Sequence, residues 1–121
     1  MSAILVADDD HTCRASIQMV LEREGYVVEA AKDVDSALTA LTRRDFDLIV
    51  CDYKMPGKTG LDLLVELRKR ASRVPVLMIS AYADNDTETA VKELGAVELL
   101  KKPFRRQELI DRATKAVGGQ S

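Results

Sequence analysis

The sequence predicts an α/β fold, a doubly wound parallel sheet built from five strand–helix units with helices on both faces. Short apolar runs alternate with longer segments whose apolar residues recur at helical spacing, over 121 residues, the size of one ordinary domain. The runs at 3–7, 47–51 and 74–80 are almost wholly apolar, which is typical of central strands in a parallel sheet. Pro75 is tolerable only near the start of its strand.

The two remaining strands, at 26–30 and 96–100, have an edge-strand character. Each carries a glutamate, Glu29 or Glu98, and a charged side chain suits an exposed edge. This pattern favours the first and third strands as central neighbours. The full strand order stays open at this point.

Five helices are predicted to follow the strands. The first spans 11–24 and ends before Gly25, a residue common just past helix ends. Asp33 can cap the second, and Gly95 closes the fourth. Apolar spacing marks the inner faces of the last four helices: Val34, Ala37, Leu38 and Leu41; Leu61, Leu64 and Val65; Ala90, Val91 and Leu94; Leu109, Ile110, Ala113 and Val117.

The composition excludes several classes of protein. It is 46% hydrophobic and 31% charged, as in globular proteins, and no apolar run approaches membrane-spanning length. The N-terminus lacks the features of a secretory signal, so a cytoplasmic location is expected. The spacing of Cys13 and Cys51 is not that of a disulfide framework or a zinc site, and Cys51, inside an apolar run, is interpreted as a core residue. The single histidine, His11, cannot make a metal site alone. The net charge of −2 argues against direct nucleic-acid binding.

Polar side chains follow four of the predicted strands at the same end. In an open parallel sheet, ligands bind beyond the carboxyl ends of the strands, so we expect these groups to converge on one rim. They are Asp8, Asp9, Asp10, Asp52, Ser80, Lys101 and Lys102.

This set of side chains has a coherent chemistry. Neighbouring carboxylates repel one another, and a hard divalent cation such as Mg²⁺, which prefers oxygen ligands and water, removes that conflict. A metal beside a carboxylate can hold a phosphoryl group while a carboxylate oxygen acts as nucleophile. A lysine supplies a counter-charge to the phosphoryl oxygens, and a serine hydroxyl can hydrogen-bond one of them. The rim therefore predicts a phospho-acceptor site.

The chain contains four motifs, one at or just after each of the first, third, fourth and fifth predicted strands: "ILVADDD", "IVCDYKMPGKTG", "VLMISAYAD" and "LLKKPF". On these motifs the chain resembles the receiver domain of response regulators in two-component signalling. The resemblance implies a flavodoxin-like (βα)5 sheet of order 2-1-3-4-5 and a cis bond between Lys102 and Pro103. It also implies a single receiver domain over 1–121, with its core at 3–117 and a tail or the start of a linker at 118–121.

The resemblance also implies a phosphorylation site and its metal. Asp52 would receive the phosphoryl group from a histidine kinase or a histidine phosphotransfer protein. Mg²⁺, or Mn²⁺, would be bound by Asp9, Asp52 and the backbone carbonyl of Lys54, with Asp8 acting through water. Asp10 reads instead as a helix cap, because carboxylates favour helix N-termini.

Further roles follow for residues around the phosphoryl group. Lys102, the switch hydroxyl of Ser80 and the backbone of Ala81 would bind it. Leu99 stands where the family usually has an aromatic residue, so we expect the signal to pass through shifts near Ser80 and not through an aromatic switch.

Two positions are implied to set the lifetime of the acyl phosphate. Lys54 and Tyr82 lie two residues after Asp52 and Ser80, where side chains influence the access of water. For Lys54, a solvated loop lysine is the alternative.

The segment from Leu99 to Lys115 is basic. The resemblance implies that a downstream output domain or a partner protein contacts the last strand and helix, and an acidic partner surface would suit the charge. A solvated helix face is the alternative. A phosphorylation-dependent dimer is also possible in such a family. The basic residues are Lys101, Lys102, Arg105, Arg106, Arg112 and Lys115.

The function predicted is a phosphorylation-controlled switch that catalyses only its own phosphorylation and dephosphorylation, not a turnover enzyme. A phosphotransferase of the haloacid-dehalogenase type needs a second aspartate two residues after the first, where this chain has Lys54. A receiver-like scaffold that works without phosphorylation is the other alternative.

Gly60 is expected to start the third helix through its backbone freedom. Met55 and Met78 are expected to pack in the core and not to act as ligands.

Overall fold

The computed structural model describes residues 2–81 and 84–118. Within these residues, five strands alternate with five helices. The strands are β1 (Ala3–Ala7), β2 (Val27–Ala31), β3 (Leu48–Asp52), β4 (Val76–Ser80) and β5 (Glu98–Lys101). The helices are α1 (His11–Arg23), α2 (Val34–Arg43), α3 (Gly60–Lys69), α4 (Asn85–Glu93) and α5 (Arg106–Gly118).

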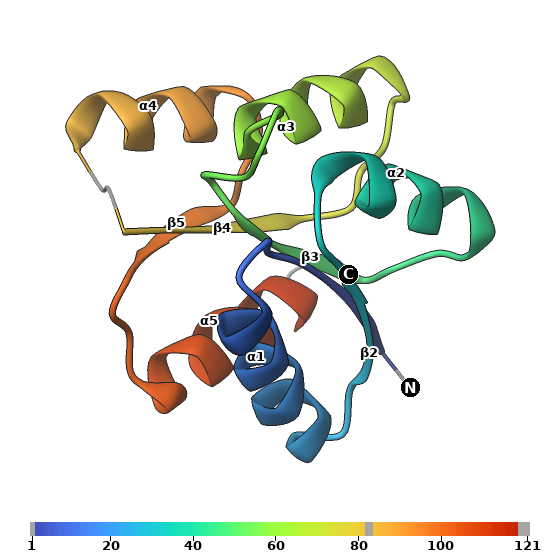
Figure 1. Cartoon of the computed structure of the whole chain (residues 1–121), viewed down its shortest axis with the longest axis vertical. Coiled ribbons are helices and arrows are strands. Elements are labelled where there is room, and N and C mark those ends of the chain that lie inside the picture. The colour runs from blue at the N-terminus through green and yellow to red at the C-terminus, as the bar shows by residue number, and fades with distance from the viewer. Residues whose placement is uncertain (1, 82–83, 119–121) are drawn as a thin grey trace.

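The strands form one parallel sheet in the order β2-β1-β3-β4-β5. Helices α1 and α5 cover one face, and α2, α3 and α4 cover the other (Figure 1). The order and the flavodoxin-like architecture are those expected from the resemblance, and the strands carrying Glu29 and Glu98 are the edges. The bond between Lys102 and Pro103 is cis, as expected.

The sheet divides the core into two layers because successive strand residues point to opposite faces. Leu5, Ile49 and Met78 belong to the layer under α2, α3 and α4. Ile4 and Leu77 belong to the layer under α1 and α5. Every residue of β1, β3 and β4 is buried, which explains why these strands read as continuous apolar runs.

The helix ends follow the local chemistry expected from the sequence. The Asp33 side chain accepts a hydrogen bond of 2.7 Å from the backbone N–H of Ser36 and so caps α2, and this bond lowers the pKa of Asp33. Gly25 and Gly95 follow α1 and α4 with φ of 95° and 105°, a region that L side chains rarely adopt.

Some predicted details were wrong. Strands β2, β3, β4 and β5 each begin one or two residues later than predicted, and α1 ends at Arg23, one residue earlier than predicted. In α3 the buried face consists of Leu63, Leu64 and Leu67, whereas Val65 is 38% exposed. Three successive apolar residues cannot all face inward from one helix, and the stripe that begins at Gly60 leaves Val65 outside.

Gly60 begins α3 for a reason that the sequence did not reveal. Its φ lies outside the left-handed region, so backbone freedom is not what the position requires. A Cβ there would lie 2.5 Å from Met78 Sδ and 3.2 Å from Tyr53 Cα. Gly60 is therefore a close-approach position between α3 and the sheet.

Both Met55 and Met78 are buried, as expected. No helix within the described ranges is long and apolar enough to cross a membrane.

Candidate functional site

The carboxyl ends of the central strands bring the predicted polar residues together. Asp52 is the last residue of β3 and only 8% exposed, and Asp8, directly after β1, is fully buried at 0%. Ser80 ends β4 and is buried, whereas Asp9 is exposed. The rim thus combines two buried carboxylates with a third that solvent reaches.

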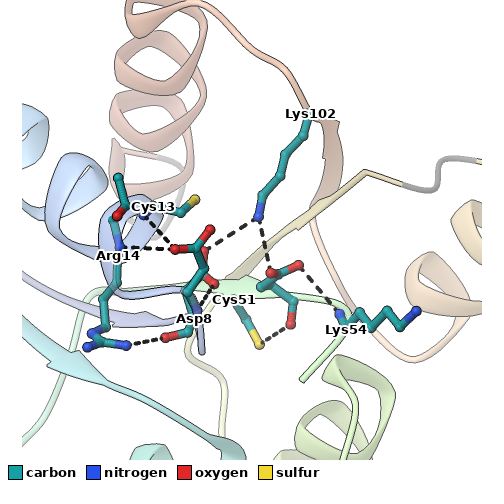
Figure 2. A network of polar contacts seen from close by, with 9 residues as sticks. Asp8, Cys13, Arg14, Cys51, Lys54 and Lys102 are labelled. Carbon is teal, nitrogen blue, oxygen red and sulfur yellow. Dashed lines mark hydrogen bonds and ion pairs between the residues drawn. The ribbon is translucent and has the colours of Figure 1, made fainter. Parts of the chain in front are cut away.

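Carboxylates and a lysine form the centre of the site. Carboxylate oxygens of Asp8, Asp9 and Asp52 all lie within 4.8 Å of one another. The ammonium of Lys102 donates a hydrogen bond of 3.1 Å to Asp52 Oδ2 and lies 3.5 Å from Asp8 Oδ2 (Figure 2). Lys102 is held there because its backbone N–H donates to the carbonyl of Ser80 at 2.8 Å, which continues the pairing of β5 with β4.

Burial and charge oppose each other at Asp52. Desolvation raises the pKa of its carboxyl group, the Asp8 carboxylate raises it further, and the hydrogen bond and charge of Lys102 lower it, with a net upward shift. Burial alone would lower the pKa of Lys102, but Asp52 and Asp8 outweigh it and raise that pKa. The lysine therefore stays protonated at neutral pH, and it is the main counter-charge that keeps Asp52 ionisable.

Hydrogen bonds made by Asp8, Asp10 and Arg14 hold the loop after β1 in place. The backbone N–H of Asp10 donates to Asp8 Oδ1 at 3.0 Å, and Asp10 Oδ1 accepts from Thr12 N–H at 3.0 Å, which confirms Asp10 as the cap of α1. Arg14 Nη1 donates to the backbone carbonyl of Asp8 at 2.7 Å (Figure 2). The sequence analysis did not predict this role of Arg14. The available signal was a basic residue in the first turn of α1, shortly after three acidic residues.

The carboxylates fit a divalent cation. Among the described residues, Asp8 Oδ2 is buried and accepts no hydrogen bond, so an oxygen taken out of water lacks a full partner. The neighbouring cavity, of about 430 Å³, is lined in part by Asp9, Asp52 and Lys102. Oxygen donors on several carboxylates and room for water suit Mg²⁺, which prefers oxygen ligands and keeps several waters.

The loops beside the cavity contain the other predicted residues. The backbone N–H of Lys54 lies 3.4 Å from Asp52 Oδ1, and Lys54 and Ala81 line the cavity. Leu99 pairs in register with Met78 and packs against the core layer under α2, α3 and α4. Tyr82 lies outside the described residues.

The two cysteines are not competing nucleophiles. Cys51 is fully buried in the core, as predicted. Burial, followed by the Asp8 carboxylate, raises the pKa of Cys13 to about 11, so that its thiol remains protonated at neutral pH. Neither thiol therefore competes with the carboxylates at this rim.

The basic residues near the end of the chain do not form one face. Arg105 directly precedes α5 and Arg106 is its first residue, at the same end of the sheet as Lys102. Arg112 lies two turns further along α5 and forms an ion pair of 2.9 Å with Glu98 at the start of β5. The predicted basic surface is thus split between the two ends of the sheet.

Comparison with known proteins identifies the family. A model of the response regulator receiver domain matches residues 4–114. This chain belongs to that family. As a receiver domain of two-component response regulators, it has in Asp8, Asp9 and Asp52 an acidic pocket that fits the family's phospho-acceptor site.

Individual relatives agree with this assignment. Protein PetR from Rhodobacter capsulatus is 37% identical over 107 residues, which cover 88% of this chain and 45% of PetR. This receiver domain therefore spans less than half the length of PetR. The receiver domain of Francisella response regulator 1452 matches with a TM-score of 0.94 and 31% identity, over 100% of both chains. TrrA from Thermotoga maritima, in complex with Mg²⁺ and BeF, matches with a TM-score of 0.86 and 29% identity, over 96% of this chain and 99% of TrrA.

Proposed function

We propose that this receiver domain is a switch that is set by phosphorylation of Asp52. The observation that carries the proposal is the geometry around that carboxylate. Asp52 ends a buried strand, Lys102 approaches it to 3.1 Å, and two further carboxylates have oxygens within 4.8 Å. A carboxylate in this position can accept a phosphoryl group, and the chain acts through partner surfaces and not through turnover of a substrate.

The phosphodonor in this proposal is a phosphohistidine of a histidine kinase or a histidine phosphotransfer protein. An Asp52 oxygen forms a bond to phosphorus while the bond from phosphorus to the imidazole nitrogen breaks, and the electron pair stays on the imidazole. Lys102 neutralises charge on the phosphoryl oxygens during the transfer. Without this positive charge, the Asp52 carboxylate would have to approach the anionic phosphoryl group against electrostatic repulsion.

The proposed cation is Mg²⁺, with Mn²⁺ as a substitute. Asp9, Asp52 and the backbone carbonyl of Lys54 would bind it, and Asp8 would act through water. When bound, it supplies positive charge to the phosphoryl oxygens. The buried Asp8 Oδ2, which accepts no hydrogen bond from a described residue, and the accessible side chain of Asp9 support this assignment. The Mg²⁺ in the TrrA complex is consistent with it.

The proposed switch uses Ser80 and the backbone of Ala81 to bind the phosphoryl group. Leu99 lacks an aromatic ring and packs in the core layer, so the conformational change is expected to pass through the loop after β4 to α4. Leu99 could take part in the conformational change only through repacking of that core layer.

Beryllofluoride, a mimic of the phosphoryl group, tests the metal requirement and the route of the switch together. With Mg²⁺, we expect bound ¹⁹F signals and amide shifts at Ser80, Ala81 and 84–93 that exceed those at Leu99. Without Mg²⁺, or in Asp52→Asn, we expect neither. Binding that persists in Asp52→Asn would contradict the assignment of Asp52, and shifts centred on Leu99 would contradict the route.

We also propose that Lys54, together with Tyr82, sets the lifetime of the acyl phosphate. Lys54 supports this through its place beside the cavity and the 3.4 Å approach of its backbone N–H to Asp52 Oδ1. The decay rate of the acyl phosphate in Lys54→Ala should differ from that in Lys58→Ala, a loop lysine that pairs with Asp35. Equal decay rates in the two variants would contradict this role and indicate that Lys54 is a solvated loop lysine.

The partners beyond the phosphodonor are an output domain or a separate protein that contacts the region of β5 and α5. Dimerisation on phosphorylation is part of the same proposal. A cytoplasmic location is proposed because the chain must meet its phosphodonor there, and direct binding of nucleic acid or membranes by this chain is not proposed.

A further inference from the structure

A second hollow lies at the opposite end of the sheet from Asp52. It is a groove of about 580 Å³ at the start of β4 and β5, between the end of α3 and the last turns of α5. Part of its lining, residues 72–75, belongs to the segment that joins α3 to β4, which can be followed in Figure 1. We call it the amino-end groove. No residue of the proposed phospho-acceptor site lines it.

The floor of the amino-end groove is apolar. Leu67 and Val76 are buried beneath it, and the half-buried side chains of Val74 and Leu94 border it. Val97, one of the few large apolar residues with about half of its surface exposed, lies on its edge. A floor of this kind can accept aliphatic side chains, and the volume is within the usual range for binding sites, about 300–1,000 Å³.

The rim of the groove is basic. It contains the cations Arg68, Arg73, Arg112 and Lys115 and the carboxylate of Glu98. The chain as a whole has a net charge of −2, so this concentration of positive charge is local. An excess of cations around an apolar floor favours a ligand that combines apolar and anionic groups.

The cations of the rim are not all neutralised within the domain. The side chains of Arg73 and Lys115 make no hydrogen bond or ion pair with another described residue. Arg112 Nε lies 2.9 Å from Glu98 Oε2, yet among the described atoms it is buried without a hydrogen bond, so the approach is an ion pair with poor alignment. A ligand carboxylate would find two cations available and a third whose present partner is poorly aligned.

We propose that the amino-end groove docks an acidic peptide segment of a partner protein. One or two aliphatic side chains of the segment enter the apolar floor, and its carboxylates pair with Arg73 and Lys115. Arg112 can join them by exchanging its partner Glu98 for a peptide carboxylate. An acidic peptide fits better than a simple anion because the floor between the cations is apolar.

This docking does not depend on phosphorylation of Asp52. Strand β4 separates the two sites, since Val76 borders the groove and Ser80 borders the phospho-acceptor rim. At the usual rise of a parallel strand, these residues are about 13 Å apart. Either site can therefore be altered without touching the other.

The test is an NMR titration of the ¹⁵N-labelled chain with a synthetic ten-residue peptide made of aspartate, glutamate and three leucines. A peptide with asparagine and glutamine in place of the acids is the neutral counterpart. We expect the acidic peptide to shift amides around Val74, Val97 and Lys115, and the neutral one to bind at least tenfold more weakly. Equal binding of both peptides, shifts elsewhere, or no shift at millimolar peptide would overturn the proposal.

Charge-reversal variants make the test specific. The pair Arg73→Glu and Lys115→Glu should weaken binding at least tenfold. The pair Arg23→Glu and Lys32→Glu changes the net charge equally at two exposed positions outside the groove and should change binding less than twofold. Equal weakening by both pairs would mean that net charge alone attracts the peptide, and would overturn the groove as its site.

Two further readouts separate the alternatives. Decanoate tests a lipid-like occupant, and a response to decanoate without a response to the peptide would overturn the proposal. Both variant pairs should still accept a phosphoryl group from acetyl phosphate at the wild-type rate. Loss of peptide binding with intact phosphorylation is the expected result for the groove variant, and loss of both would contradict the independence of the two sites.

Discussion

Replacing Lys102 by methionine is expected to slow phosphorylation of Asp52 about a hundredfold at neutral pH, the usual effect of losing one charged group that stabilises a transition state. Lys102 is the group that approaches both buried carboxylates, at 3.1 Å from Asp52 and 3.5 Å from Asp8. Methionine keeps most of the length of the side chain and removes the charge. Phosphorylation by acetyl phosphate, followed by mass spectrometry over time, measures the rate.

The same substitution should change the pH dependence of phosphorylation. Lys102 lowers the pKa of Asp52 against the effect of burial, so its removal raises that pKa further. Because the ionised carboxylate is the proposed nucleophile, the pH of half-maximal rate should move upward. Lys101→Met is the matched control, since Lys101 is an exposed neighbour, and it should leave both rate and profile unchanged. Equal effects of the two substitutions would contradict a specific part for Lys102.

Replacing Gly60 by alanine is expected to lower the free energy of unfolding by about 2 kcal/mol, which is typical of overpacking in a core. The new Cβ would lie 2.5 Å from Met78 Sδ and 3.2 Å from Tyr53 Cα. Met78 is fully buried, so a shift of its thioether away from the new Cβ would displace neighbouring core side chains. The backbone N–H of Gly60, which donates to the Tyr53 carbonyl at 2.7 Å, resists any shift of the helix. Urea denaturation measures the loss.

Two controls show whether the clash with Met78 is the cause. Gly118→Ala, at the end of α5, meets nothing within 4 Å and should leave stability unchanged or slightly raised. In a Met78→Ala background, Gly60→Ala should cost less than about 1 kcal/mol, because neighbouring substitutions are not additive. The same cost in both backgrounds would show that the strain comes from somewhere other than Met78.

Local rules predicted much of this structure. Asp33 and Asp10 cap helices because a side-chain oxygen placed before a helix can accept its free N–H groups, and this depends only on nearby residues. The apolar runs of β1 and β4 identified central strands for an equally simple reason. Placing Asp8 and Asp52 at one rim needed only the rule that parallel strands share their carboxyl ends.

Properties that depend on packing between distant segments were not predictable in this way. Strand order came from the resemblance, because the apolar pattern favoured only the central pair. The close approach of Gly60 to Met78 joins positions on different elements, and the exposure of Val65 depends on which stripe of α3 meets the sheet. Likewise, a basic segment in the sequence gave no sign that Arg106 and Arg112 belong to opposite ends of the fold.

The central claim, that Asp52 accepts a phosphoryl group with the help of a divalent cation, is tested most directly by intact-mass spectrometry. The wild-type chain and Asp52→Asn are incubated with acetyl phosphate, with and without Mg²⁺. We predict the addition of one phosphoryl group to the wild type with Mg²⁺, and no addition without Mg²⁺ or in the variant. A phosphoryl group gained by Asp52→Asn, or no gain by a wild type shown to bind Mg²⁺ and then supplied with phosphorylated histidine kinases, would contradict the account.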